Sequence, residues 1–217
     1  MNLDHRRRVM LAALLFVAAL AAFAWVASGL EPGAPLASVD AWSGRWLHRQ
    51  ASPWLTEAMI GISFIGAPST LTAVAALPCL ILLRRRSYRV AAELFTLVLG
   101  GNLLNVGLKH LFHRGRPVLD DSVAALTSYS FPSGHAMAST VFYGVVLPCL
   151  LLDRRRRRAA VIAGIAVIAL VGLSRVYLGV HYASDVIGGI LEALAWSTLI
   201  LTLWLLASDH RRETASR

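Results

Sequence analysis

Lysine is nearly absent from this sequence, cysteine is rare, and charged residues of either sign are few. Lys109 is the only lysine among 21 basic residues, and charged residues make up only 15% of the 217 positions. Apolar residues make up 57%, and the mean hydropathy is +0.62. A soluble globule of this length has too little interior to bury so much apolar surface. These figures exclude an ordinary soluble enzyme and a disordered chain, and they indicate a protein that lies largely in lipid.

The two cysteines also exclude a class of protein. Cys79 and Cys149 lie inside apolar runs and lack Cys-x-x-Cys spacing, so we interpret them as buried thiols. A secreted domain held together by disulfides is therefore excluded. We expect neither a metal site nor a cofactor.

Six apolar stretches are long enough, or nearly so, to cross a bilayer as helices. They cover residues 9–28, 58–83, 90–108, 136–152, 159–173 and 186–207. We predict an all-α fold in which residues 1–217 form one integral membrane domain, a bundle of six transmembrane helices. The first stretch resembles a signal peptide, but its apolar run of about 20 residues is longer than the usual 7–15. We interpret it as a retained helix.

The basic residues divide unequally between the two ends of these stretches. Fifteen fall at one end, including the run Arg154–Arg158, and six fall at the other. Because positive loops stay in the cytoplasm, we predict that both termini are cytoplasmic and that the protein is a multi-pass protein of a bacterial inner membrane. The arginine run is then a topology signal, and no nucleic-acid partner is expected.

The first outer loop, residues 29–57, has helical periodicity. Leu36, Val39, Trp42 and Trp46 are spaced by three and four residues, which predicts a short helix with one apolar face. The helix is interpreted as lying in the membrane interface. The alternative is a lid beside a lipid entry path.

Three polar segments stand at the outer ends of the predicted helices, where charged groups are costly and indicate function. They are Lys109…Arg116-Pro117, Pro132-Ser133-Gly134-His135 and Ser174-Arg175…His181…Asp185. Cations and helix N-terminal amides suit a phosphate, and two histidines suit a nucleophile and a general acid. The predicted active site therefore lies at the outer membrane–water interface.

Each segment also has a structural interpretation. Lys109 and Arg116 share a helix face if the helix extends outward, and both could be interfacial side chains. Ser133 could be the N-cap of a helix. His181 and Asp185 are four residues apart and can touch at a helix start, although Asp185 could instead cap that helix.

Together, the three segments resemble the signature of the type 2 phosphatidic acid phosphatase (PAP2) family, which reads K-x6-R-P, P-S-G-H and S-R-x5-H-x3-D. All three motifs occur in this order, and the resemblance covers about residues 90–206. It implies a metal-independent phosphatase with a phosphohistidine intermediate. By motif matching, His181 is the nucleophile, Asp185 orients it, and His135 is the general acid. The residues that would hold the phosphoryl oxygens are Lys109, Arg116, Ser133, Gly134 and Arg175.

The expected function is hydrolysis of lipid phosphates or pyrophosphates. Undecaprenyl pyrophosphate is favoured over phosphatidylglycerol phosphate and phosphatidic acid, because its phosphate is released on the outer leaflet. The expected partners are the lipid phosphate substrate and membrane lipids, with no obligate protein partner. A lipid-linked phosphotransferase would carry the same motifs, and a non-catalytic lipid transporter or scaffold is a further alternative.

Other polar residues in the core have structural interpretations. Glu192 is predicted to form a structural hydrogen bond, and Asn102 and Asn105 are predicted to link helices. His110 and His113 match no motif position.

Overall fold

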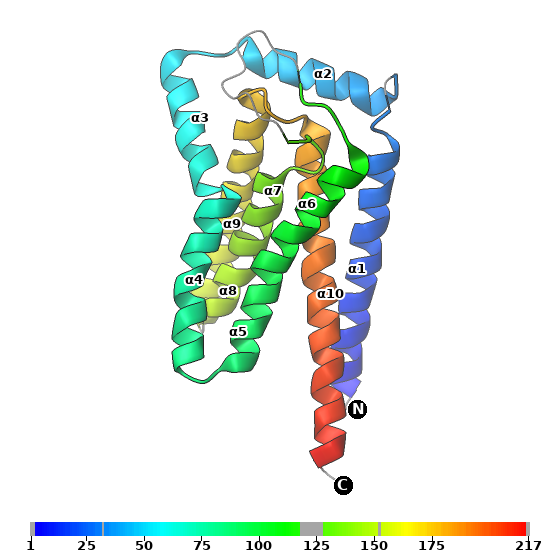
Figure 1. Cartoon of the computed structure of the whole chain (residues 1–217), viewed down its shortest axis with the longest axis vertical. Coiled ribbons are helices and arrows are strands. Elements are labelled where there is room, and N and C mark those ends of the chain that lie inside the picture. Colours follow the sequence, from blue (N-terminus) through cyan, green and yellow to red (C-terminus); the bar gives the residue numbers. More distant parts are fainter. Residues whose placement is uncertain (1–2, 32, 118–127, 152, 216–217) are drawn as a thin grey trace.

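The computed structural model describes residues 3–31, 33–117, 128–151 and 153–215, with side chains described as far as residue 207. Regular structure in these ranges is entirely helical, which confirms the all-α prediction (Figure 1). The helices are α1 (Leu3–Ser28), α2 (Pro35–His48), α3 (Pro53–Ile65), α4 (Pro68–Arg84), α5 (Tyr88–Phe95), α6 (Gly101–Phe112), α7 (Gly134–Ser139), α8 (Leu147–Leu150), α9 (Arg154–Tyr177) and α10 (Ala183–Ala215). Two π-helical segments, η1 (Thr96–Gly100) and η2 (Thr140–Val146), join α5 to α6 and α7 to α8.

Within the described ranges, four helices are long and apolar enough to cross a membrane. They are Leu3–Ser28, Tyr88–Phe112, Arg154–Tyr177 and Ala183–Ala207. The pair α3 and α4 would form a fifth span, and Gly134–Leu150 is a shorter apolar helix. The structure thus supports four or five of the predicted spans, and the sixth remains a prediction.

The second predicted span, residues 58–83, is not one continuous helix. It divides into α3 and α4, which meet at 41°. Pro68 begins α4, and a proline disfavours helical geometry in the preceding residue; Ala67 is accordingly extended, with φ −66° and ψ 135°. At the bend, a Cβ on Gly66 would lie 2.3 Å from Cγ1 of Val171, so only glycine lets α3 approach α9 this closely.

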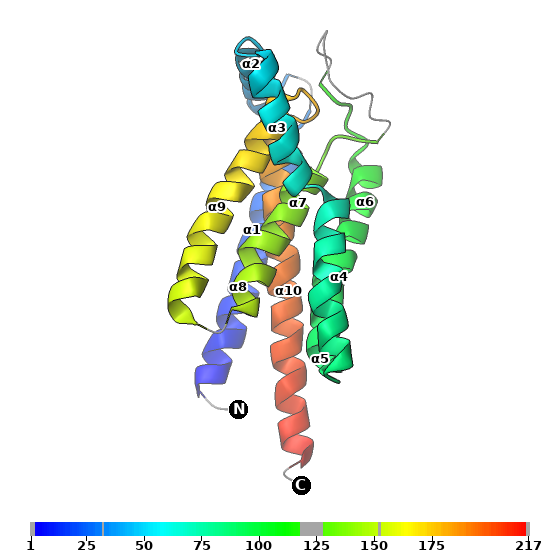
Figure 2. The same cartoon turned by 90° about the vertical axis from the view of Figure 1, so that its left-hand side faces the viewer.

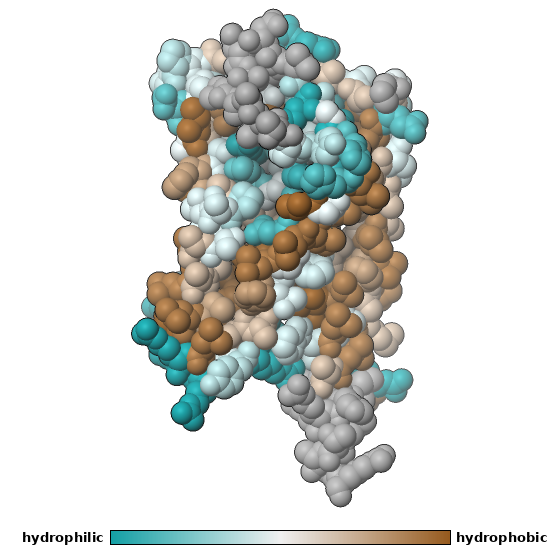
Figure 3. All heavy atoms as spheres, in the orientation of Figure 1, coloured by the Kyte–Doolittle hydropathy of each residue, from teal (hydrophilic) through white to brown (hydrophobic). Residues whose placement is uncertain are grey.

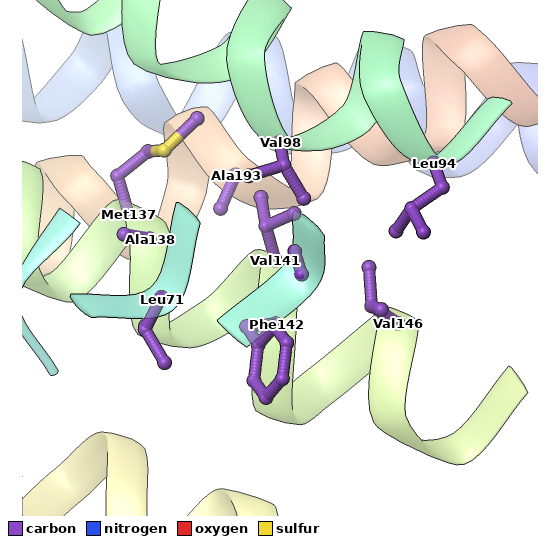
Figure 4. Close-up of a cluster of buried hydrophobic side chains, with 10 residues drawn as sticks. Leu71, Leu94, Val98, Met137, Ala138, Val141, Phe142, Val146 and Ala193 are labelled. Atoms are coloured by element: carbon purple, nitrogen blue, oxygen red, sulfur yellow. The ribbon is translucent and has the colours of Figure 1, made fainter. Parts of the chain in front are cut away.

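The helices pack around a small apolar core and expose apolar side chains outward. Leu71, Leu94, Val98, Met137 and Val141 bring α4, α5, η1, α7 and η2 together (Figure 4). On the face drawn in Figure 3, hydrophobic residues predominate over the middle of the molecule, and hydrophilic residues gather toward its two ends. Large apolar residues exposed in this way face lipid in a membrane protein.

α1 lies along α10, and the last part of α1 and the first part of α10 meet the segment before α7. The ring of Phe23 in α1 lies 5.4 Å from that of Phe131, which in turn lies 4.9 Å from that of Phe112 at the end of α6. Figure 2 shows the long α10 running through the bundle, with α9 and α4 on opposite sides. This packing fixes the three helix ends that carry the polar segments.

The two ends of the bundle carry different connections (Figure 1). The start of α1, the α4–α5 turn, the start of α9 and the end of α10 gather at one end. α2, the end of α6, the start of α7 and the α9–α10 turn gather at the other. The separation of arginine-rich connections from motif-bearing ones is as predicted, whereas the membrane side that each end faces remains a prediction.

α2 crosses the motif-bearing end of the bundle (Figure 1). The predicted short helix is therefore present. Leu36 packs near Phe23, whereas Val39, Trp42 and Trp46 are exposed, and the two indole rings stack at 6.3 Å. Whether α2 gates lipid entry remains a prediction.

Candidate active site

The three polar segments meet at one end of the bundle, around the start of α10. His181 and Asp185 are both buried, and Nδ1 of His181 lies 3.4 Å from Oδ2 of Asp185. Ser130 donates a short hydrogen bond to the same Oδ2, and the backbone N–H of Tyr182 also donates to it at 2.8 Å. The carboxylate is thus held by several donors beside the imidazole.

The surroundings of His181 keep its imidazole neutral. Burial lowers the pKa of His181 to about 4, although the hydrogen bond and the negative charge of Asp185 act in the opposite direction. The positive charges of Lys109 and Arg116 lower it further. With Nδ1 facing a carboxylate, the ring proton belongs on Nδ1, and Nε2 carries the lone pair. That lone pair is what a nucleophile requires.

Arg116 faces the other side of the His181 ring. Its Nη1 lies 3.4 Å from Nε2 of His181, and the same guanidinium donates to the backbone oxygens of Val180, Ser128 and Tyr129. Burial lowers the pKa of Arg116, and Asp185 opposes this shift. Arginine stays charged in proteins, so Arg116 keeps a cation at the atom that would attack phosphorus.

Lys109 and Arg116 converge, but not along one helix as the spacing had suggested. α6 ends at Phe112, because His113 adopts the left-handed conformation with φ 48°. Arg116 therefore lies beyond the helix, in a segment without regular secondary structure. Lys109 Nζ donates to the carbonyl of Tyr129 at 2.7 Å, and Arg116 Nη2 donates to the same carbonyl at 3.3 Å. This shared acceptor joins the two cations.

The motif Pro132-Ser133-Gly134-His135 opens α7, and Ser133 occupies the N-cap position. Its side chain makes no capping hydrogen bond, contrary to the structural interpretation, and its Oγ is buried without a partner. The start of α7 is pinned to α10, since the N–H of Ser133 donates to the carbonyl of Asp185 at 2.9 Å. α10 approaches so closely that a Cβ on Gly189 would lie 2.4 Å from the Ser133 carbonyl.

Arg175 also presents an unused donor. Its side chain is buried at the end of α9; one nitrogen donates to Ser63 of α3, and Nε has no partner. A buried N–H without a partner is costly, so such a group at a site points to a missing acceptor. The unpaired donors of Ser133 and Arg175 therefore indicate a ligand whose oxygen atoms accept hydrogen bonds.

His135 is half-buried in the first turn of α7. It lies close enough to Arg175, His181, Lys109 and Arg116 for their charges to act on it. Among the described residues, no side-chain hydrogen bond fixes its ring. The structure thus brings His135 to the same group of residues as the other predicted site positions.

A cleft of about 780 Å³ opens from His181 toward α2. It is lined on one side by Val176, Gly179, His181 and Tyr182, and on the other by the residues of α2 that face the bundle. Those residues are Asp40, Ala41, Gly44, Arg45 and His48, together with Arg49 at the C-cap of α2. The buried imidazole therefore borders an open cleft.

Comparison with known proteins shows the family of this chain. Residues 90–208 match the PAP2 superfamily. The chain belongs to the PAP2 superfamily. Phosphatidylglycerophosphatase B of Bacillus subtilis is 40% identical over 147 residues, which cover 63% of this chain and 69% of that protein. A lipid A 1-phosphatase of Rhizobium etli is 33% identical over 123 residues, 52% of this chain and 50% of that protein.

Solved PAP2 structures share the fold. The crystal structure of a transmembrane PAP2 type phosphatidylglycerolphosphate phosphatase from Bacillus subtilis matches with a TM-score of 0.76 and 29% identity, covering 85% of this chain and 93% of the other. Aquifex aeolicus LpxE matches with a TM-score of 0.58 at 22% identity, covering 75% and 94%. The protein is thus a membrane-embedded phosphatase of the PAP2 superfamily.

Beyond the PAP2 motifs, a second group of residues supports the site. Arg114 donates to Oδ1 of Asp185 at 2.6 Å, to Ser184 at 2.7 Å, and to Oδ2 of Asp40 at 2.8 Å. Its guanidinium also lies 4.2 Å from the centre of the Tyr182 ring. Although burial lowers the pKa of Arg114, the two carboxylates outweigh it, and the pKa is raised.

Sequence reasoning missed this second group, because its members match no motif and Asp40 is 74 residues from Arg114. Asp40 is almost fully buried in α2 and also accepts the backbone N–H of Ser184 at 2.9 Å. The available signal was an arginine two residues before the Arg116-Pro117 motif. Through Asp40, the helix α2 is tied directly to the start of α10.

The remaining polar predictions are structural. Asn105 donates to Glu192 at 2.7 Å, and Asn102 donates to Thr72 at 3.0 Å, as expected for contacts between helices. His110 and His113 pack edge-on against the ring of Tyr129. In the part of the chain that the structure describes, no three His, Cys, Asp or Glu residues are grouped to hold a metal ion.

Proposed function

We propose that this PAP2 protein hydrolyses phosphate or pyrophosphate monoesters of membrane lipids through a phosphohistidine on His181. One observation carries the proposal. Nε2 of His181 faces the cation Arg116, while Nδ1 faces Asp185 and Ser130. A neutral imidazole held in this way is a nucleophile aimed at a bound phosphoryl group.

The binding part of the proposal uses the unpaired donors. Ser133 Oγ and Arg175 Nε are buried without partners, and a phosphoryl group supplies acceptors for both. Lys109 and Arg116 add positive charge. Gly134 is the first residue of α7, and the free N–H groups at a helix start suit an anion. These cations take the role that a metal ion plays in other phosphatases, so we propose that the reaction needs none.

The reaction has two steps. In the first, Nε2 of His181 forms a bond to phosphorus as the bond from phosphorus to the lipid oxygen breaks, and His135, starting as the protonated imidazolium, gives a proton to that oxygen. In the second, neutral His135 accepts a proton from water, whose oxygen bonds to phosphorus as the P–N bond breaks. The products are the dephosphorylated lipid and inorganic phosphate, and both histidines return to their starting states.

The relatives suggest which lipid to test first. Phosphatidylglycerophosphatase B and lipid A 1-phosphatase are named for lipid substrates with a phosphate group. We place phosphatidylglycerol phosphate first, with undecaprenyl pyrophosphate and phosphatidic acid beside it. The charge distribution supports a bacterial inner membrane location with the site facing outward.

Phosphate release from purified protein in a neutral detergent tests the proposal. Each of the three lipids is supplied separately, with and without excess chelator. We expect release from at least one lipid, unchanged by the chelator and lost in His181→Ala. Activity that disappears with chelator and returns with magnesium would overturn the metal-independent mechanism.

A further inference from the structure

A row of basic side chains continues from the candidate active site along α2. Arg45, His48 and Arg49 line the cleft that also contains His181. These three residues are not part of the PAP2 motifs, and the proposed reaction at a single phosphorus atom does not use them. They therefore require a different explanation.

The cleft-facing side of α2 is electrostatically positive. Among the described residues that line the cleft, Asp40 is the one carboxylate, and Arg114 already pairs with it. Arg45 and Arg49 are exposed toward the open space, and His48 is half-buried. Among the lining residues, these basic groups are left without an acidic partner, and an anion in the cleft would meet them.

The position of α2 is fixed relative to His181. Asp40 binds Ser184 and Arg114, and Ser184 lies three residues from His181 at the start of α10. Gly44 and His48 follow Asp40 at intervals of one helical turn, so they continue along the same face. The helix that carries the basic row is thus held in a fixed position beside the cleft.

The other side of α2 differs. Val39, Trp42 and Trp46 are exposed on it, and it carries no basic group among them. The cations of α2 are therefore concentrated on the side that faces the cleft, where a substrate head group would lie. A helix that served only as an interfacial membrane anchor would not need cations on the side that faces the cleft.

We infer that the α2 wall binds a second anionic group of the substrate, next to the phosphoryl group that His181 attacks. This inference rests on the proposed function and narrows its substrate class. A lipid with two anionic phosphoryl groups fits, whether the second is the phosphodiester of phosphatidylglycerol phosphate or the inner phosphate of a prenyl diphosphate. Phosphatidic acid has no such group.

The test is the double variant Arg45→Gln/Arg49→Gln. A control, Arg84→Gln/Arg85→Gln, removes the same charge from exposed positions at the other end of the bundle. KM and kcat are measured in neutral detergent with phosphatidylglycerol phosphate, a prenyl diphosphate and phosphatidic acid. Loss of charge-assisted contacts should raise KM about tenfold for a two-anion substrate, and less than about twofold for phosphatidic acid.

The lipid that shows the larger increase identifies which second anion the wall binds. An equal increase for phosphatidic acid would contradict the inference and assign the arginines to general attraction of anionic lipid. Unchanged KM for all three lipids would also contradict it.

A binding measurement separates this inference from the proposed function. Inorganic pyrophosphate should stabilise the wild type against thermal unfolding more than phosphate does, and the double variant should lose that difference. If the wild type hydrolyses no lipid but shows this difference, the proposed function fails and the second anion site stands. If pyrophosphate and phosphate stabilise the wild type equally, the inference fails whatever the activity.

Discussion

Arg114 and Asp185 form a buried ion pair, with Nη1 of the arginine 2.6 Å from Oδ1 of the carboxylate. Asp185 therefore does not depend on His181 alone for its orientation. The same guanidinium reaches Asp40, so the carboxylate beside the candidate nucleophile is held through a residue outside the PAP2 motifs.

We predict that Arg114→Gln lowers kcat by about 10- to 100-fold, the range typical of residues that orient a site through another residue. The physical reason is that Asp185 loses its charged partner and no longer holds the imidazole in one position. Arg114→Lys should restore part of kcat, because it returns the charge without the two-pronged geometry. Steady-state kinetics of both variants, with Arg84→Gln as the control, checks this; a change confined to KM would contradict a positioning role.

The neutral state of His181 predicts a dependence of stability on pH. Its pKa is about 4 in the folded protein and about 6.5 in an unfolded chain, so protons bind the unfolded chain first as pH falls. This contribution to the free energy of unfolding is complete above pH 6.5 and is lost toward pH 4, with about 2 kcal/mol gone by pH 5.

Melting temperatures in detergent from pH 7 to pH 5 measure this effect. The wild type should lose more stability over that range than His181→Asn, whose side chain does not titrate. Parallel curves for the two proteins would show that His181 has an ordinary pKa and would remove the argument for a neutral nucleophile.

The orientation in the membrane is testable with two single cysteines. In a background with Cys79 and Cys149 replaced by serine, Gln50→Cys lies at the motif-bearing end, and Arg85→Cys lies at the arginine-rich end. An impermeant thiol reagent applied to intact cells should label only Gln50→Cys. Labelling of Arg85→Cys alone would reverse the predicted orientation.

His135 should matter in proportion to the basicity of the leaving group. His135→Asn should cost about 10²–10⁴ in kcat with an alkyl phosphate lipid, because the alkoxide needs a proton as it leaves. With an aryl phosphate, whose leaving group is a weak base, the loss should be markedly smaller. Equal losses with both substrates would assign His135 to phosphate binding.

Much of the fold could be predicted from local pattern, because lipid requires long apolar helices and places charge at their ends. The all-helical fold and the meeting of the three motifs at one end both follow from this constraint. The bend between α3 and α4 was missed, although Pro68 was visible, because whether a proline bends a span depends on its neighbours. Here Gly66 allows the close contact with Val171 that accompanies the bend.

The support around the site could not be predicted, because it depends on contacts between distant segments. Asp40 in α2, Arg114 after α6 and Ser184 in α10 meet only in the folded chain. The break between α6 and Arg116 was also not predicted, because nothing in the sequence around His113 requires its left-handed conformation. Ser133 looked like a cap by residue type, whereas its hydroxyl is left unpaired.

The central claim is that phosphorus is transferred to His181. If so, His181→Ala should lose at least about 10³ in turnover with every substrate, since the nucleophile belongs to a unit that fails as a whole. Asp185→Asn should lose less, because it disturbs the orientation of the ring without removing it.

Trapping the intermediate tests this claim most directly. Wild-type protein is mixed with substrate labelled in the scissile phosphate and quenched rapidly without acid, and the labelled residue is mapped. The account predicts acid-labile, base-stable label on His181 in the wild type and none in His181→Ala. Label on another residue, or substantial turnover by His181→Ala, would contradict it and favour direct attack by water.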